Sequence, residues 1–528
     1  MRCGAALTSV AHVKRSALVL ALIACAAAVT PVSLQTPALA AAPPIRIKVM
    51  SFNIQYGAYY STIGAVVDAI VVADADVVGL QEPFGKTRKI ARMLGWYASP
   101  RLHLVSRFPI VHPGGSRVEG PPGGRIPEGA WAYLLLGSGA VAAIAQTHTP
   151  WWPSGMYAML QGEDEAEVLD REQGKLAWLQ PHLDAVAAPI AAGVPTFFVG
   201  DLNTPSHLDW TQAAVDALGW QPSTLDPPGE RYVVAWPVTL AMESAGFFDT
   251  YREANPDPIA EPGFTYCADL YPACGKWDTW DRIDYVYTAG PISVVSSEVV
   301  GEGGPYTDIR SRPWPTDHRA VVSTVDVTLV TPDPFAAALD ERIFIGRSVQ
   351  AAFYDSAAPG RTIGLWSPGA DPAVDAAAVS APVDAADDDG TVALATADLD
   401  SGDYTLALID GASVVASSSV ALVERTAPAT ITTSARRYER GEPIRVEWTG
   451  GSGNRYDWLS LNRNCFDPST CALRQWRYID GRVSGAARFT KGSEGIWPLR
   501  AGRYAVSLCV DDDYRCVATS EVFRIVRP

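Results

Sequence analysis

Residues 197–203 read Phe-Phe-Val-Gly-Asp-Leu-Asn. An apolar run of this kind is typical of a buried strand, and here it ends in two polar residues, Asp201 and Asn203. Side chains two residues apart on a strand point to the same side, so both should face one place. Because α/β proteins commonly build their sites at strand ends, the stretch indicates an α/β fold with a polar site at a sheet edge.

Four further stretches place polar residues at the ends of apparent strands. Residues 50–54 read Met-Ser-Phe-Asn-Ile, residues 76–82 end an apolar run in Gln-Glu, and residues 145–148 read Ala-Gln-Thr-His. The last is a pair, Asp-Arg-Ile-Asp at 281–284 and Thr-Asp-His at 316–318. A carboxylate that ends a buried run is either ion-paired or a ligand of a hard cation. Each stretch alone is a weak signal, but the ordered set is specific.

Residues 44–326 alternate strand-like and helix-like segments, which is an α/β pattern. The periodicity predicts strands over 45–52, 76–80, 102–105, 131–146, 196–199 and 283–287, and helices over 64–73 and 163–188. The longer helix has an acidic first turn, which suits the positive end of the helix dipole.

The chain changes character after residue 325. Ala, Asp, Ser and Gly become common, and Pro332 and Pro334 mark a linker. Residues 401–410 and 501–510 resemble each other, and short strands between Gly and Asp turns predict two immunoglobulin-like β-sandwich domains, at 333–425 and 427–528. We see no chemistry in them. They are either spacers or contacts to a cell surface, glycan or membrane, and no obligate protein partner is inferred.

The N-terminus has the pattern of an export signal. Arg2, Lys14 and Arg15 precede an apolar stretch over 16–29, and small residues at 38–40 suit a signal peptidase, so residues 1–40 are predicted to be a signal peptide of a secreted protein. The alternative is a lipid anchor on Cys25, since residues 22–25 resemble a lipobox. The remaining cysteines suit disulfides of an exported chain and lie in the close pairs Cys267/Cys274, Cys465/Cys471 and Cys509/Cys516.

These motifs together resemble those of the endonuclease/exonuclease/phosphatase family, which includes DNase I, exonuclease III, neutral sphingomyelinases and inositol-polyphosphate 5-phosphatases. Over residues 46–326 they occur in the family order, as FNIQ, LQE, VSRFPI, QTH, GDLN, RIDYV and TDH. The resemblance implies a DNase I-like, four-layer α/β sandwich with two sheets packed face to face and helices outside. It also implies metal-dependent hydrolysis of a phosphoester.

The resemblance implies a metal site at three of these positions. Glu82 would be the main ligand, with Asn53 and Asp317 near the metal. Mg²⁺ prefers oxygen ligands and keeps several waters, so one or two carboxylates suffice. We therefore expect Mg²⁺ as the cofactor, with Mn²⁺ or Ca²⁺ as alternatives.

The resemblance implies catalytic roles for five more residues. Asp201 would orient or deprotonate the attacking water, and Asn203 would hold the phosphate. His318, oriented by Asp284, would contact the scissile phosphate or transfer a proton, since a carboxylate partner fixes the tautomer of a histidine. His148 would stabilise developing charge or protonate the leaving oxygen. Which residue is the general base stays open.

Three further residues have two interpretations each. Asp281 is the alternative to Asp284 as the partner of the histidine. Arg107 and Arg319 are either phosphate contacts or members of structural ion pairs.

The substrate is indicated only by charge and aromatic residues. The net charge is −16, and the sequence lacks the Lys/Arg clusters that track a nucleic-acid backbone. Trp151 and Trp152 follow His148, and His207 and Trp210 follow the Asp/Asn pair, so these four are predicted to contact substrate, with ordinary packing of a loop as the alternative. The net negative charge together with these aromatic residues favours a small or lipid-linked phosphoester as the substrate. An extracellular nuclease is the alternative, and a non-catalytic surface-binding protein is the remote one.

Overall fold

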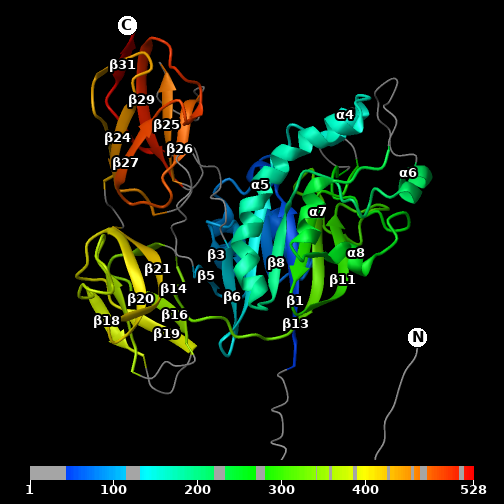
Figure 1. Ribbon diagram of the computed structural model, residues 1–528, viewed down its shortest axis with the longest axis horizontal. Helices are drawn as coiled ribbons and strands as arrows, with labels where there is room; N and C mark the ends of the chain where they lie inside the picture. The colour runs from blue at the N-terminus through cyan, green and yellow to red at the C-terminus, as the bar shows by residue number, and fades with distance from the viewer. Residues whose placement is uncertain are drawn as a thin grey trace, which may run out of the picture. The chain divides into compact units, whose positions relative to one another are not determined.

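The computed structural model describes residues 43–113, 131–218, 232–268, 280–340, 342–355, 360–383, 389–424, 428–453, 457–463, 473–510 and 516–527. The predicted signal peptide, Cys25, Cys274, Cys465 and Cys471 lie outside these residues. Residues 43–528 form one compact unit, shown in Figure 1.

The α/β region contains two mixed sheets. The first has the spatial order β12 (Ile309–Arg310), β11 (Ile292–Gly301), β13 (Ala320–Val327), β1 (Ile45–Asn53), β2 (Val77–Gln81), β4 (Leu104–Ser106) and β3 (Tyr97–Ser99). The second has the order β5 (Ile110–Val111), β6 (Trp131–Gly137), β7 (Ala140–His148), β8 (Thr196–Asp201), β10 (Asp284–Ala289) and β9 (Phe248–Asp249). These strands explain the apolar runs that end in polar residues.

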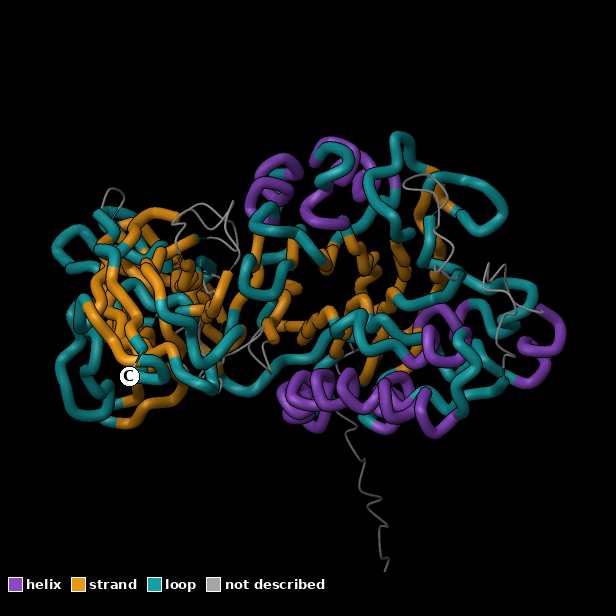
Figure 2. The backbone as a smooth tube through the Cα atoms, turned by 90° about the horizontal axis from the view of Figure 1, so that it is seen from above, coloured by secondary structure: helices purple, strands orange, loops and turns teal. Residues whose placement is uncertain are grey.

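The two sheets pack against each other and are covered by helices. Val49 and Val77 of the first sheet share a buried core with Ile144 and Val199 of the second. The helices are α1 (Gln55–Ala58), α2 (Ile63–Val72), α3 (Thr87–Leu94), α4 (Gly155–Leu160), α5 (Glu165–Ala191), α6 (Gln212–Leu218), α7 (Pro237–Ser244) and α8 (Thr250–Ala254). Helices α2 and α3 cover the outer face of the first sheet, and α5 and α7 cover that of the second. Figure 2 shows the strands between two outer groups of helices.

One predicted strand is wrong in extent. Residues 131–146 were expected to form a single strand, but they form the hairpin β6–β7. The turn contains Gly137 and Gly139, with φ angles of 93° and 70°, and these are values that glycine adopts without strain. The long helix is present as α5, where Asp164 caps the first turn by accepting from the backbone N–H of Glu167 at 3.1 Å.

The C-terminal region is rich in strands. Its first part has two sheets. One has the order β14 (Phe335–Ala338), β16 (Val349–Tyr354) and β19 (Asp389–Leu394). The other has the order β15 (Arg342–Phe344), β21 (Ser413–Val423), β20 (Gly402–Asp410), β17 (Thr362–Trp366) and β18 (Val379–Pro382). Its second part also has two sheets. One has the order β22 (Thr430–Thr433), β24 (Ile444–Thr449) and β27 (Gly485–Phe489). The other has the order β23 (Arg437–Glu439), β31 (Phe523–Val526), β29 (Gly502–Cys509), β25 (Trp458–Arg463), β26 (Leu473–Tyr478) and β28 (Glu494–Gly495), and β30 (Cys516–Thr519) pairs with β29. Each part has its own buried core, and Cys509 and Cys516 form a disulfide.

Candidate active site

Strand register brings three of the predicted residues side by side. His148 at the end of β7 pairs with Asp201 at the end of parallel β8, and Asp201 pairs with Asp284 at the start of antiparallel β10. Side chains opposite each other on neighbouring strands lie close together. Three motifs far apart in sequence therefore meet at one edge of the second sheet.

Asp201 is the centre of this cluster. Its Oδ2 accepts from Nδ2 of Asn53 at 2.9 Å, and the same oxygen lies 3.4 Å from Nε2 of His148 and 3.8 Å from Nε2 of His318. Its Oδ1 accepts from the backbone N–H of Asn203 at 2.9 Å. Asn53 comes from the first sheet, so the centre spans the edges of both sheets.

His318 is held by a carboxylate and an aromatic ring. Its Nδ1 lies 2.9 Å from Oδ2 of Asp284, and its ring lies 4.9 Å from that of Tyr266. Burial alone would lower the pKa of His318, but the charges of Asp284 and Asp201 outweigh it and raise that pKa from 6.5 to about 10. The imidazolium is therefore the form present at neutral pH. Its Nδ1 bond to Asp284 leaves Nε2 directed toward Asp201.

The pKa of Asp201 is shifted by its position. Burial and the nearby charge of Asp284 raise it, and both histidines and the Asn53 amide act in the opposite direction. Desolvated carboxylates next to specific charge partners are typical of catalytic sites. Asp284 contributes a second sign of such a site, because its buried Oδ1 has no hydrogen-bond partner among the described residues.

Glu82 and Asp317 form a second, acidic part of the site. Oε2 of Glu82 accepts from the backbone N–H of Tyr56 at 2.8 Å, and Oδ2 of Asp317 accepts from Nε2 of Gln55 at 2.7 Å. Burial and the charge of Glu82 raise the pKa of Asp317. A divalent cation would relieve this repulsion, and carboxylate oxygens are the ligands that Mg²⁺ prefers. The two residues therefore fit the predicted metal site.

Two site residues have an uncommon backbone conformation. Glu82 and Asn203 have φ angles of 55° and 47°, in the left-handed region that non-glycine residues seldom adopt. Such conformations cost about 1–3 kcal/mol and persist where surrounding contacts enforce them. For Asn203 these contacts include its side-chain Nδ2, which donates to the backbone oxygen of Thr149 at 3.0 Å.

Residues 50–318 match the profile of the Endonuclease/Exonuclease/phosphatase family, and this segment contains every residue of the cluster. The chain belongs to this family. Its members are metal-dependent phosphoester hydrolases, so the protein is an enzyme of that class with a DNase I-like fold.

Two individual proteins illustrate the similarity. The uncharacterized protein F14F9.5 of Caenorhabditis elegans is 26% identical over 313 residues, which are 52% of this chain and 90% of that protein. A crystal structure of truncated Caenorhabditis elegans TDP2 is 16% identical and covers 54% of this chain and 98% of its own, with a TM-score of 0.31.

A second group of side chains has metal-binding potential. Ligand atoms of Asp201, Asp284 and His318 lie within 4.8 Å of one another. In this arrangement Nδ1 of His318 lies 2.9 Å from Oδ2 of Asp284, and its Nε2 lies 3.8 Å from Oδ2 of Asp201. The described residues thus contain two candidate cation sites, this group and the acidic pair of Glu82 and Asp317.

The four predicted substrate contacts have different surroundings. Trp151 and Trp152 are exposed, with 66% and 51% of their surface accessible, and Trp151 comes three residues after His148. Trp210 is buried against Trp236 in a hydrophobic cluster, which gives it a packing role. His207 contacts α7, with Nε2 at 2.9 Å from Glu243. Of the four, Trp151 and Trp152 are the most exposed, while His207 lines a separate surface pocket.

The residues with two interpretations are resolved by their contacts. Asp284 makes the hydrogen bond to His318, as expected over Asp281. Arg319 forms a buried ion pair with Glu302, and Arg107 pairs with Asp74 and Asp76 at the surface. Both arginines are thus members of structural ion pairs.

The structure adds residues that the sequence analysis missed. Gln55 belongs to the quoted FNIQ motif, and its contact with Asp317 could have been sought there. Lys175 lies on α5, is 1% exposed, and donates from Nζ to Glu172 at 2.8 Å and to the backbone oxygen of Asn203 at 2.6 Å. It supports the turn that carries Asn203, and no local motif indicates this.

Proposed function

We propose that the protein is an exported, divalent-metal-dependent phosphodiesterase. The observation that carries the proposal is the Asp201 cluster, in which a buried carboxylate contacts Asn53, His148 and His318 beside the acidic pair Glu82 and Asp317. The signal-like N-terminus and the Cys509–Cys516 disulfide are compatible with export. Among the described residues, no helix is long and apolar enough to span a membrane.

The proposed roles follow from these contacts. Asp201, fixed by Asn53, orients the attacking water and accepts its proton. The protonated His318 donates from Nε2 to a phosphate oxygen, and His148 supplies a proton to the leaving oxygen. Asn203 holds the phosphate. A divalent cation at Glu82 and Asp317, with Asn53 nearby, would neutralise phosphate charge in the transition state.

Exposed aromatic residues support a diester rather than a monoester. Trp151 and Trp152 follow His148, and Tyr56, whose N–H binds Glu82, is 55% exposed. Tyr56 also contacts Phe84. Two aromatic segments next to one centre can hold the two substituents of a phosphodiester. They suit the predicted small or lipid-linked substrate, because aromatic rings contact sugars, choline-like cations and membrane surfaces.

A nuclease is the second candidate, supported by a basic groove that the sequence analysis did not anticipate. It is lined by Arg88, Lys89, Arg92, Arg342 and Arg347. The C-terminal β-rich parts, proposed to be immunoglobulin-like domains that contact a surface, glycan or membrane, contribute the last two of these residues.

The test is Mg²⁺-dependent hydrolysis of bis-p-nitrophenyl phosphate and p-nitrophenyl phosphate, followed by phospholipids and nucleic acids. We expect Asp201→Ala and His318→Ala to lower turnover of the best substrate by roughly 10²–10⁴-fold, the usual contribution of general acid–base groups. EDTA should abolish turnover, and Mg²⁺ should restore it. Asp398→Ala, which removes an exposed carboxylate of the C-terminal region, is the matched control. Full activity of both site variants would refute the mechanism.

A further inference from the structure

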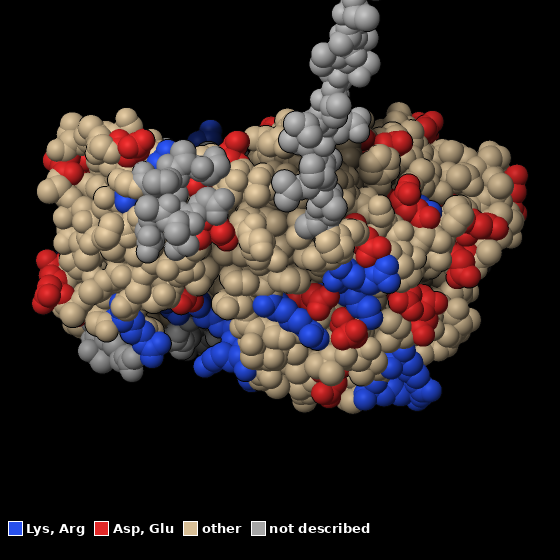
Figure 3. Space-filling model, turned by 90° about the horizontal axis from the view of Figure 1, so that it is seen from below, with Lys and Arg blue, Asp and Glu red and all other residues tan. Residues whose placement is uncertain are grey.

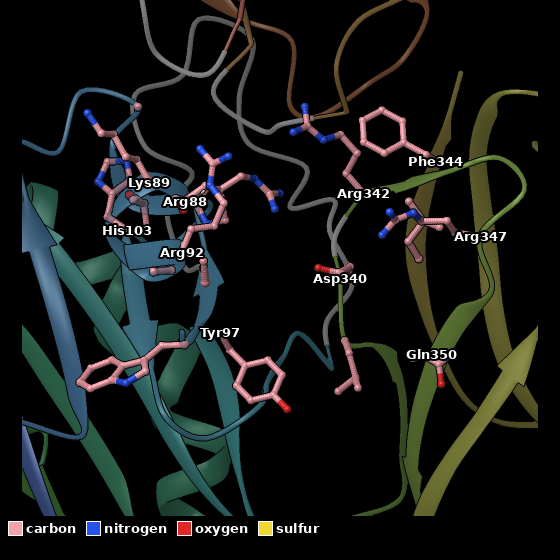
Figure 4. A pocket seen from close by; sticks show the side chains of 18 of the residues that line it. Arg88, Lys89, Arg92, Tyr97, His103, Asp340, Arg342, Phe344, Arg347 and Gln350 are labelled. Carbon is pink, nitrogen blue, oxygen red and sulfur yellow. Dashed lines mark hydrogen bonds between the residues drawn. The ribbon is translucent and has the colours of Figure 1, made fainter. Parts of the chain in front are cut away.

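This acidic protein has a basic groove whose lining begins at Gly85, three residues after Glu82. It has a volume of about 1090 Å³ and is lined by five cationic side chains, Arg88, Lys89, Arg92, Arg342 and Arg347, with Asp340 as the acidic residue among the lining groups. Figure 4 shows Arg88 and Arg92 on one wall and Arg342 and Arg347 on the other. Since the net charge is −16, this concentration of positive charge runs against the composition.

Three of these cations have no carboxylate partner among the residues that the structure describes. Lys89, Arg92 and Arg347 are exposed, and within the described part of the chain they form no ion pair. Charged side chains that remain unpaired next to one another repel, so an anionic ligand would stabilise the groove. On the face drawn in Figure 3, patches of Lys and Arg side chains lie beside and between patches of acidic ones.

The groove is connected to the metal site by a short path. Gly85 lines the groove and follows Glu82 by three residues. Between them, Phe84 contacts Tyr56 at a ring-centroid distance of 5.5 Å, and both rings are exposed. Two exposed rings therefore lie next to Glu82, in or against the segment that leads to the groove.

The groove also contains aromatic side chains. Trp96, Tyr97 and Phe344 line it between the cationic groups, and Tyr97 is 44% exposed. A positively charged groove with interleaved aromatic rings is the usual binding surface for single-stranded nucleic acid, whose bases stack while the backbone follows the charge. Double-stranded nucleic acid fits this groove less well, because its base faces are stacked inside the duplex. A membrane also fits less well, because a flat bilayer does not reach the residues at the bottom of the groove.

We propose that this groove, formed by α3 and the β15 segment, is a binding site for single-stranded nucleic acid that leads the strand to the metal centre. Its volume is at the upper end of small-molecule pockets, which suits a chain of several nucleotides better than one phosphate. The inference deepens the proposed function, on which it depends for cleavage, whereas binding to the groove stands by itself.

The test measures binding and hydrolysis separately. Binding of a fluorescein-labelled oligothymidylate of about 20 nucleotides is followed by fluorescence anisotropy in EDTA, where cleavage does not interfere. We expect Lys89→Glu/Arg92→Glu to weaken binding by about tenfold or more and to reduce the salt slope by about 1.4, which corresponds to two lost phosphate contacts. Bis-p-nitrophenyl phosphate turnover with Mg²⁺ should stay unchanged, because neither residue belongs to the catalytic cluster.

Controls separate the competing outcomes. Arg437→Glu/Arg440→Glu changes the net charge equally at exposed positions outside the groove and should leave binding intact. Equal binding by the groove variant and wild type would overturn the proposal. So would binding of phosphatidylglycerol vesicles without binding of the oligonucleotide, which would make the groove a membrane contact. Absence of bis-p-nitrophenyl phosphate turnover in the wild type would instead count against the phosphodiesterase function.

Discussion

His318 lies between two carboxylates, which should make its charge unusually persistent. Its folded-state pKa of about 10 exceeds the ordinary value of 6.5, so protonation of this ring stabilises the fold fully below about pH 6.5. That stabilisation is lost as the pH rises through about 10.

Removing one carboxylate should therefore shift the titration. We expect Asp284→Asn to lower the pKa of His318, since it removes the largest of the charges that raise it. Nitrogen chemical shifts of labelled histidines in the metal-free protein would report this directly. A wild-type His318 that titrates near 6.5, like a solvent-exposed imidazole, would show that the carboxylates do not act as described.

Single residues were predictable where a strand ended in a polar group. Asn53 and Asp201 end apolar runs, Asp284 begins one, and the structure brings their side chains together. Lys175 was not predictable, because a lysine on an amphipathic helix normally faces solvent. Only the tertiary fold shows that its ammonium group reaches the backbone of Asn203.

At the scale of elements, the packing of the two sheets depends on small side chains at their interface. Gly79 of β2 faces β8 so closely that an added Cβ would lie 2.3 Å from Cγ2 of Val199 and 2.9 Å from Oε1 of Gln146. We expect Gly79→Ala to destabilise the α/β region by about 1–3 kcal/mol, the usual effect of overpacking. The measurement is the midpoint of thermal unfolding.

A second glycine provides a control of opposite sign. Gly174 lies on the exposed side of α5, and an added Cβ there would meet nothing within 4 Å, so Gly174→Ala should stabilise the helix by about 0.5–1 kcal/mol. If Gly79→Ala and Gly174→Ala changed the midpoint of thermal unfolding in the same direction and by the same amount, the close approach of the sheets at Gly79 would not contribute to stability as described.

Element boundaries were predicted less well than element types. The α5 helix was expected and is present, whereas residues 131–146 were assigned one strand because both halves are apolar. A buried hairpin and a buried strand have similar hydrophobic patterns, and Gly137 and Gly139 were the signal for the turn.

At the scale of the whole molecule, charge balance was a poor guide to local charge. The groove combines residues 88–92 with residues 342–347, which are distant in sequence, and the basic run at residues 86–92 reveals only one of its walls. Net charge describes the average surface, while binding depends on how side chains gather. The preference for a non-nucleic substrate relied on that average, and the groove weakens it.

The α/β region and the first β-rich part share a core. Phe335 of β14 lies 5.7 Å from the ring of Tyr133 on β6, in a buried cluster that also includes Val141. Nearby, Oδ2 of Asp389 accepts from the backbone N–H of Gly139 at 2.8 Å. A linker was expected just before this point, at Pro332 and Pro334, but buried contacts resume directly after it.

Phe335→Ala should therefore weaken both parts at once. Loss of a buried phenylalanine costs about 3–5 kcal/mol, and the cavity would open in the shared cluster, so calorimetry should show a lower transition for the α/β region and for the first β-rich part together. Phe248→Ala is the control, because Phe248 is 58% exposed and should shift unfolding little. If only the β-rich transition moved, the two parts would unfold independently, and Arg342 and Arg347 would not be held opposite α3. The groove would then need bound nucleic acid to assemble, and binding should grow weaker in the Phe335→Ala protein.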